Sequence, residues 1–175
     1  AQHLKAAGAK VKFCSVLGKD PLSSFVKKEI RKSGIKDFTL IDSQRPTTEK
    51  KYFISDGHRL LKVDTVENSP IRSETLNKIC NHIKNHKKGI VIFSDFRHGI
   101  FSKESIKKLK KSINKKVFKV GDSQVASRWG NILDFSNFDL ITPNEREARF
   151  ALADQDSSIR PLATKLYNKS NCKTL

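Results

Sequence analysis

The sequence predicts an α/β fold in which a mostly parallel sheet is flanked by helices. Segments with helical periodicity alternate with short apolar runs along almost the whole chain. One of these runs, residues 89–93, is uninterrupted, which is typical of a strand covered on both faces. This alternation favours parallel strands joined by helices.

The first part of the chain is expected to form two helices and two strands, and the strands belong to this sheet. Residues 3–7 resemble the end of a helix that a glycine closes, and residues 11–17 form a short apolar strand. An amphipathic helix follows at 22–32, and a second strand at 38–42. These elements form the start of an alternating sheet.

A segment at about 45–66 departs from the alternation of helix and strand. Two extended runs, 47–54 and 59–64, flank Asp56-Gly57, a dipeptide that favours a tight hairpin turn. We therefore expect residues 1–175 to form one incomplete domain, with a small β lid inserted at about 45–66.

The second part of the chain returns to the alternation. Helices are expected at 73–85, 102–113, 145–152 and 161–169, and strands at 89–93, 116–120 and 138–142.

Composition restricts the class of protein. The chain is 37% hydrophobic and 30% charged, and none of its apolar runs is long enough to span a bilayer. Three cysteines in no metal or redox spacing favour a reducing cytoplasm. We therefore expect a cytoplasmic protein with no membrane partner.

The net charge of +17 raises the question of nucleic-acid binding. The positive charge is mostly lysine spread along predicted helices, and the basic runs lack interleaved aromatic residues that could stack on bases. A solvated lysine-rich surface explains the charge better than a nucleic-acid partner does. The same charge attracts anionic small molecules.

Polar side chains follow three of the predicted strands. Asp95, Asp122 and the Thr142-Pro143-Asn144 segment each come directly after an apolar run. Because the carboxyl ends of parallel strands meet at one edge of a sheet, these residues define a candidate ligand site. Asp95 and Asp122 would bind sugar hydroxyls or metal-bound water; the alternative is that each caps the turn or helix that follows.

Asn144 and Glu147 are the most specific pair at this edge. They lie three residues apart at the expected start of a helix, so the first turn presents both on one side. A carboxamide and a carboxylate can hold the water shell of Mg²⁺. The alternative is an N-cap asparagine with first-turn acids that stabilise the helix.

Other candidate motifs are weak. Gly18-Lys19-Asp20 lacks the glycine and hydroxyl residue of a phosphate-binding loop. His82 and His86 have metal-ligand spacing on a helix but no third ligand, so a solvated polar face explains them better. Trp129 would either stack on a ligand or cap the edge of the core.

Seven short segments together resemble the ribokinase-like, or phosphofructokinase B, family of carbohydrate kinases, and within it the kinase domain of bifunctional heptose-phosphate kinase/adenylyltransferase proteins. They are, in chain order, Gly8-Ala9-x-Val11, Ser15-Val16-Leu17-Gly18-x-Asp20, Pro46-Thr47-Thr48-x-Lys50, Leu60-Leu61-Lys62-Val63-Asp64, Ser94-Asp95-Phe96-x-x-Gly99, Asp122 and Thr142-Pro143-Asn144-Glu145-x-Glu147.

The resemblance implies a three-layer αβα sandwich with a β lid, and ATP-dependent phosphoryl transfer to a sugar or sugar phosphate. It implies that Asn144 and Glu147 organise Mg²⁺ and ATP. It also implies that Lys50 and Lys62 of the lid, with Asp95 and Asp122, serve the substrate, and that lids pair in a homodimer. The chain departs from the heptose kinases at Tyr52, where a basic residue is usual, and at Lys62, where arginine is usual, so the sugar stays open.

The resemblance covers only the central part of such a kinase domain. The family's first strand would precede Ala1, and its Gly-Ala-Gly-Asp segment with the catalytic base would follow Leu175. We therefore expect a truncated, inactive piece of a longer kinase, with no catalytic base among these residues. The alternative is a non-catalytic kinase-like module that binds sugar or nucleotide as a sensor or scaffold.

Overall fold

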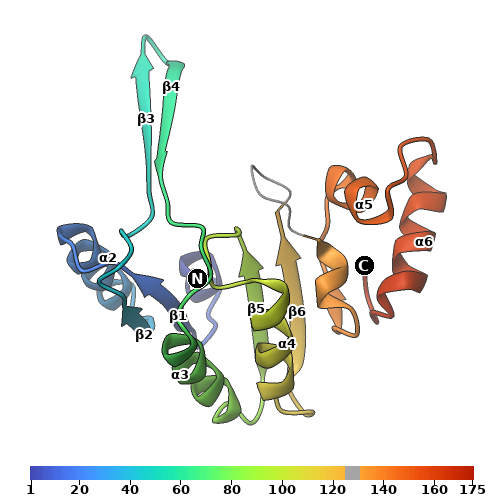
Figure 1. Cartoon of the computed structure of the whole chain (residues 1–175), viewed down its shortest axis with the longest axis horizontal. Helices are drawn as coiled ribbons and strands as arrows, with labels where there is room; N and C mark the ends of the chain where they lie inside the picture. The colour runs from blue at the N-terminus through green and yellow to red at the C-terminus, as the bar shows by residue number, and fades with distance from the viewer. Residues whose placement is uncertain (125–130) are drawn as a thin grey trace. The chain divides into compact units, whose positions relative to one another are not determined.

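The computed structural model describes residues 1–124 and 131–175, so Trp129 lies outside the described residues. The chain divides into two compact units, Ala1–Ser69 and Pro70–Leu175 (Figure 1). Both units join parallel strands to helices, as the sequence predicts.

The first unit begins with a helix and a two-stranded parallel sheet. Its elements are α1 (Gln2–Ala6), β1 (Lys12–Leu17), α2 (Pro21–Lys32) and β2 (Lys36–Ile41). β1 and β2 pair in parallel, and α2 is the crossover between them. Asp20 caps α2 by accepting a hydrogen bond from the Ser23 backbone N–H at 2.9 Å, and a proline occupies the first turn, where its missing N–H costs nothing.

The predicted lid is a β-hairpin of β3 (Glu49–Ser55) and β4 (His58–Thr65). Asp56 and Gly57 both have positive φ, 48° and 78°, as a two-residue type I′ turn requires. The hairpin extends away from the sheet and α2 of its own unit (Figure 1), and every residue of β4 is exposed. The expected hairpin is confirmed.

The second unit carries a three-stranded parallel sheet in the order β5-β6-β7. Its elements are α3 (Ser73–Lys84), β5 (Ile90–Asp95), α4 (Lys103–Ser112), β6 (Phe118–Ser123), the 3₁₀ turn η1 (Ile132–Phe135), β7 (Leu140–Ile141), α5 (Glu145–Leu152) and α6 (Ile159–Ser170). After α6, Thr174 forms an isolated parallel bridge with Leu140.

Aromatic packing forms the core of this unit. The ring of Phe93 on β5 lies 5.4 Å from that of Phe101, 6.2 Å from Phe135 and 5.6 Å from Phe138. Gly121 on β6 is required here, because a Cβ atom at this position would stand 2.7 Å from Cβ of Phe135. The carboxyl ends of the strands are therefore anchored from one face of the sheet.

Within the described residues, the opposite face of the same sheet is exposed, whereas the apolar run at 89–93 predicts a strand covered on both faces. Ile90 and Ile92 are 58% and 45% exposed, and Phe118 of β6 is 41% exposed. Only the alternate residues, led by Phe93 at 4%, are packed against the aromatic cluster. No helix among the described residues is both long and apolar enough to cross a membrane.

Candidate functional site

The carboxyl ends of β5 and β6 extend further than the apolar runs indicate. β5 includes Ser94 and Asp95, and β6 includes Asp122 and Ser123. The strands pair Ser94 with Asp122 and Asp95 with Ser123. Successive residues of a strand point to opposite faces. The carboxylates of Asp95 and Asp122, which were predicted to share one site, therefore lie on opposite faces of the sheet.

Asp122 occupies the open face. Its carboxylate accepts a hydrogen bond from the Thr142 hydroxyl at 3.0 Å, which joins the ends of β6 and β7. Ser94 is exposed and directly opposite Asp122 on the neighbouring strand. The sequence did not lead us to predict that Ser94 neighbours Asp122. Extending the predicted strand 89–93 by two residues, with side chains still alternating between faces, would have predicted it.

Asp95 occupies the buried face and is only 1% exposed. Its carboxylate lies 2.9 Å from Nε of Arg97 and accepts the Arg97 backbone N–H at 2.7 Å. Nη2 of the same guanidinium donates to the Asp134 carboxylate at 2.8 Å. Burial raises the pKa of Asp95 to about 6, while the Arg97 guanidinium acts in the opposite direction. The structure therefore places Asp95 in a buried charge network, where it caps the turn that follows β5, the alternative given for it from the sequence.

Arg97 was not a candidate from the sequence. It adopts a left-handed backbone conformation with φ of 57°, which aims its guanidinium back at Asp95. A non-glycine residue in this region is strained unless its surroundings hold it there. No local sequence signal indicates that this arginine reaches Asp134, 37 residues away.

Asn144 and Glu147 form a complete capping box at the start of α5. The Asn144 side-chain oxygen accepts the Glu147 backbone N–H at 3.0 Å, and the Glu147 carboxylate accepts the Asn144 backbone N–H at 2.9 Å. The Asn144 side-chain amide also donates to Glu147 at 2.8 Å. Glu147 is 6% exposed and Asn144 is exposed, so the pair is rigid with the amide at the surface.

This geometry allows one kind of role toward Mg²⁺. Each Glu147 oxygen already accepts an N–H from Asn144, and the described residues contain no group of three acidic, histidine or cysteine side chains that could hold a metal alone. Mg²⁺ commonly reaches protein through its own waters and nucleotide phosphates. The pair therefore fits contact with the water shell of a Mg²⁺–nucleotide complex and not direct ligation.

The two lid lysines lie on one face of the hairpin. Lys50 is opposite Asp64, and Lys62 is opposite Tyr52. The Lys62 ammonium lies 2.7 Å from the Asp64 carboxylate, which raises the pKa of Lys62, and both side chains are partly exposed. Both predicted substrate lysines are therefore at the surface of the first unit.

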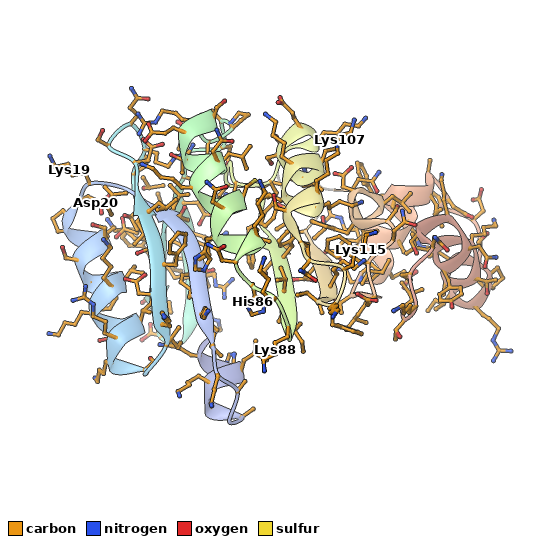
Figure 2. All side chains as sticks on the ribbon, turned by 90° about the horizontal axis from the view of Figure 1, so that it is seen from below. Lys19, Asp20, His86, Lys88, Lys107 and Lys115 are labelled. Atoms are coloured by element: carbon orange, nitrogen blue, oxygen red, sulfur yellow. The ribbon has the colours of Figure 1, made fainter. Side chains whose placement is uncertain are left out.

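The base of the lid is fixed by a short hydrogen-bond network that the sequence interpretation did not predict. The Asp20 carboxylate accepts the Thr47 backbone N–H at 2.7 Å as well as capping α2, and the Thr47 hydroxyl accepts the Gly18 N–H at 2.9 Å. These bonds hold the pKa of Asp20 below its usual range. Figure 2 shows Lys19 and Asp20 together between β1 and α2.

The excess positive charge is distributed over separate elements. Lys107 projects from α4 and Lys115 from the turn that follows it, while His86 and Lys88 lie before β5 (Figure 2). On α4, the exposed Lys108 pairs with Glu104 at 2.9 Å. The distribution agrees with a solvated lysine-rich surface.

The fold is that of an α/β protein with polar side chains at the carboxyl ends of its parallel strands, the edge at which open α/β sheets commonly place their ligands. The model of the pfkB family of carbohydrate kinases matches residues 1–173, and the chain belongs to this family.

Curated relatives include proteins named bifunctional protein HldE. That of Nitratiruptor sp. is 28% identical over 152 residues, covering 86% of this chain and 31% of the relative. That of Helicobacter hepaticus is 27% identical over 168 residues, covering 90% of this chain and 34% of the relative. The chain thus spans about a third of the length of these relatives.

Solved structures share the fold at low sequence identity. Phosphofructokinase-2 of Escherichia coli, in a tetrameric inhibited form, superposes with a TM-score of 0.76 at 13% identity and covers 99% of this chain and 58% of its own. Ribokinase of Giardia lamblia gives a TM-score of 0.71 at 16% identity, covering 97% of this chain and 54% of its own. The ribokinase-like fold predicted from the sequence is confirmed.

Proposed function

We propose that this chain is part of a kinase that transfers a phosphoryl group from ATP to a hydroxyl of a sugar or sugar phosphate. Membership of the carbohydrate kinase family supports the reaction class. The observation that carries the proposal is the rigid Asn144–Glu147 pair, which begins α5 three residues after β7 ends. Phosphoryl transfer depends mainly on positioning and electrostatic stabilisation, which a pre-ordered polar pair provides.

Asn144 and Glu147 are assigned to the nucleotide side. Asn144 presents its amide to the Mg²⁺ water shell and the ATP phosphates, and Glu147 fixes the orientation of that amide through its buried carboxylate. When bound, Mg²⁺ supplies positive charge that neutralises the phosphates. The residues of this chain supply the fixed hydrogen-bonding groups around it.

The sugar side is assigned to Asp122, Lys50 and Lys62. Asp122 is on the open face of the sheet, where a carboxylate held by Thr142 can accept hydrogen bonds from sugar hydroxyls. Lys50 and Lys62 provide positive charge for an anionic substrate. Asp95 takes a positioning role, because its buried pair with Arg97 fixes the end of β5 beside Ser94.

A homodimer through the lid is part of the proposal. Register places Phe53 and Leu61 opposite each other on one face of the hairpin, with Lys51 and Val63 as the next pair. Phe53, Leu61 and Val63 are 50%, 53% and 41% exposed. An apolar stripe on a two-stranded hairpin gains stability when a second copy covers it.

The three free cysteines agree with a cytoplasmic location.

The test uses the full-length product of the gene that encodes these residues. ADP release from Mg-ATP is followed with a panel of free sugars and sugar phosphates, and the 175-residue chain alone, which we expect to be inactive, is the comparison. We expect turnover with at least one sugar, reduced at least tenfold by Glu147→Ala. Ser102→Ala, which removes the cap of α4 through the same kind of capping box, is the matched control for a general loss of helix stability.

The second candidate is a non-catalytic module that binds sugar or nucleotide. The observation that favours it is the capping box itself, since both Glu147 oxygens serve the helix start without any metal. Binding of a sugar or of ATP with no ADP release from any substrate in the panel would favour this candidate and contradict the kinase proposal.

A further inference from the structure

The buried side of the carboxyl edge of the sheet holds two polar side chains with hydrogen-bonding atoms left over. Asp95 at the end of β5 and Ser123 at the end of β6 are paired across the strands, so they share one face, and each is 1% exposed. Among the described residues, neither Oδ2 of Asp95 nor the Ser123 hydroxyl makes a hydrogen bond. Buried polar atoms in proteins nearly always find a partner, so this neighbouring pair calls for a physical reason.

The Asp95 carboxylate holds the turn that follows β5. Its Oδ1 accepts the Arg97 backbone N–H at 2.7 Å, and its Oδ2 lies 2.9 Å from Nε of Arg97. That Nε makes no hydrogen bond among the described residues, so its contact with Oδ2 is electrostatic and depends on the negative charge of the carboxylate. Arg97 has a φ of 57°, a conformation that a non-glycine residue keeps only while its surroundings hold it there.

The surroundings of Asp95 make its charge adjustable. Burial, the largest effect, raises the pKa of Asp95 to about 6. Arg97 acts against that rise, whereas Asp134 on η1 and Asp122 on β6 add to it. From α4, the Lys110 ammonium donates to the Asp134 backbone carbonyl at 3.2 Å, and it is the cation that this helix contributes to the region. The carboxyl group therefore gains or loses its proton close to neutral pH.

We propose that Asp95, Arg97 and Ser123 form an acid-sensitive latch on the turn after β5. The ionised carboxylate holds Arg97 in its left-handed conformation. When Oδ2 takes up a proton from solvent, the new O–H donates to the Ser123 hydroxyl, the electrostatic contact with Nε is lost and the turn is released. Release loosens Ser94, which precedes Asp95 on the exposed face, and so weakens sugar binding; this last step rests on the proposed kinase function.

Hydrogen exchange tests the latch without any ligand. Exchange of the Arg97 backbone amide is measured in the full-length gene product between pH 5 and pH 8 and corrected for the intrinsic effect of pH. Protection is expected to fall roughly fivefold or more at pH 5, because a hydrogen bond to a carboxylate becomes a weaker one to a neutral carboxyl group. The Thr47 amide is the internal control. It donates to Asp20 at 2.7 Å, and the pKa of Asp20 lies below its usual range, so its protection should not change.

Four variants separate the latch from a general loss of stability. Asp95→Asn, neutral at every pH, is expected to show low protection of Arg97 at pH 8 as well as at pH 5. Ser123→Ala removes the acceptor of the protonated form, so the midpoint of the transition moves about 0.5–1 pH unit lower, with protection at pH 8 unchanged. Ser112→Ala, at another buried serine, leaves the midpoint in place. His98→Gln also leaves it in place, although histidine titrates in the same range. Wild type and Ser123→Ala decide the matter if Asp95→Asn does not fold.

The consequence for the sugar is measured in the same preparations. Calorimetry without ATP gives the dissociation constant of each free sugar and sugar phosphate of the panel at pH 5 and pH 8. Because only the ionised form holds the turn, the wild-type dissociation constant should rise roughly tenfold from pH 8 to pH 5. Asp95→Asn is the reference, since it keeps any pH effect of the ligand's own phosphate and loses that of Asp95.

Four results overturn the latch: equal protection of Arg97 at pH 5 and pH 8, a transition that persists in Asp95→Asn, a midpoint unmoved by Ser123→Ala, or a transition abolished by His98→Gln. Turnover that depends on Glu147, with the same pH dependence of sugar affinity in wild type and Asp95→Asn, refutes the step to the sugar and leaves the kinase proposal intact. Asp95-dependent protection of Arg97 with no ADP release from any sugar refutes the kinase proposal and leaves the latch.

Discussion

Replacing Arg97 with methionine removes the positive partner of a buried carboxylate. Asp95 is 1% exposed, and the Arg97 side chain that lies 2.9 Å away is 11% exposed. Methionine keeps much of the stem of the side chain and the same left-handed backbone strain, so the main change is loss of the charge. Asp95 would then be a buried carboxylate without its cation.

The magnitude follows from the burial of the pair. Removing one partner of a buried ion pair costs about 3–5 kcal/mol, because the remaining charge is desolvated without compensation. The pKa of Asp95 is already raised to about 6 by burial, against an ordinary 3.8, and Arg97 opposes that rise. In Arg97→Met, the folded-state pKa therefore rises further above the unfolded value.

The sign of the pH dependence is fixed by this shift. Between pH 4 and the folded-state pKa, the folded protein binds the Asp95 proton more tightly than the unfolded chain does, so stability falls as pH rises. Urea unfolding of Arg97→Met should therefore show a smaller loss, relative to wild type, at pH 5 than at pH 8. The Asp95→Asn/Arg97→Met double variant should recover most of the loss, and Arg160→Met, an exposed arginine on α6, should show little change. A loss below about 1 kcal/mol at pH 8, or a loss equal at both pH values, refutes this reasoning.

Three further predictions concern the two units separately. Gly18→Ala should destabilise the first unit by about 1–3 kcal/mol in urea unfolding, because the new Cβ would stand 2.5 Å from the Thr47 backbone nitrogen; loss under 0.5 kcal/mol contradicts this. Cys14 should resist alkylation at pH 8 in the folded protein, since burial raises its pKa to about 11, and rapid labelling of the native state contradicts that burial. Asp154→Asn should speed hydrogen exchange of the backbone amides that follow α5 at neutral pH, because Lys165 and neighbouring N–H groups hold the pKa of Asp154 low. The difference in exchange rate between variant and wild type should vanish as pH falls through that lowered pKa, and a difference that persists in acid contradicts the assignment.

Local sequence patterns accounted for most elements of the fold. Helices and strands followed from apolar periodicity, and the lid turn from Asp56-Gly57, because these signals depend on residues close together in the chain. The Asn144–Glu147 pair was predictable for the same reason, since its geometry arises within one helical turn.

Long-range features were not predictable from the sequence. Polar residues at the ends of β5 and β6 resembled loop residues, so both strands were predicted to end early and the opposite faces of Asp95 and Asp122 were missed. The contact of Arg97 with Asp134 depends on the fold bringing distant segments together. The β-bulge that makes Leu60 an extra residue of β4 depends on cross-strand register, which alternation alone does not determine.

Asn144 is the residue at which helix capping and nucleotide binding can be separated. Serine at this position keeps a Ser-x-x-Glu capping box and caps about as well as asparagine, but it lacks the side-chain amide that donates to Glu147 at 2.8 Å.

The most direct measurement of the central claim is therefore the steady-state kinetics of Asn144→Ser in the full-length gene product, with urea unfolding of the same preparation. The kinase account predicts unchanged stability and a kcat/KM for Mg-ATP lowered at least tenfold. Unchanged kcat/KM with unchanged stability would show that Asn144 only caps α5 and would contradict its assignment to the nucleotide.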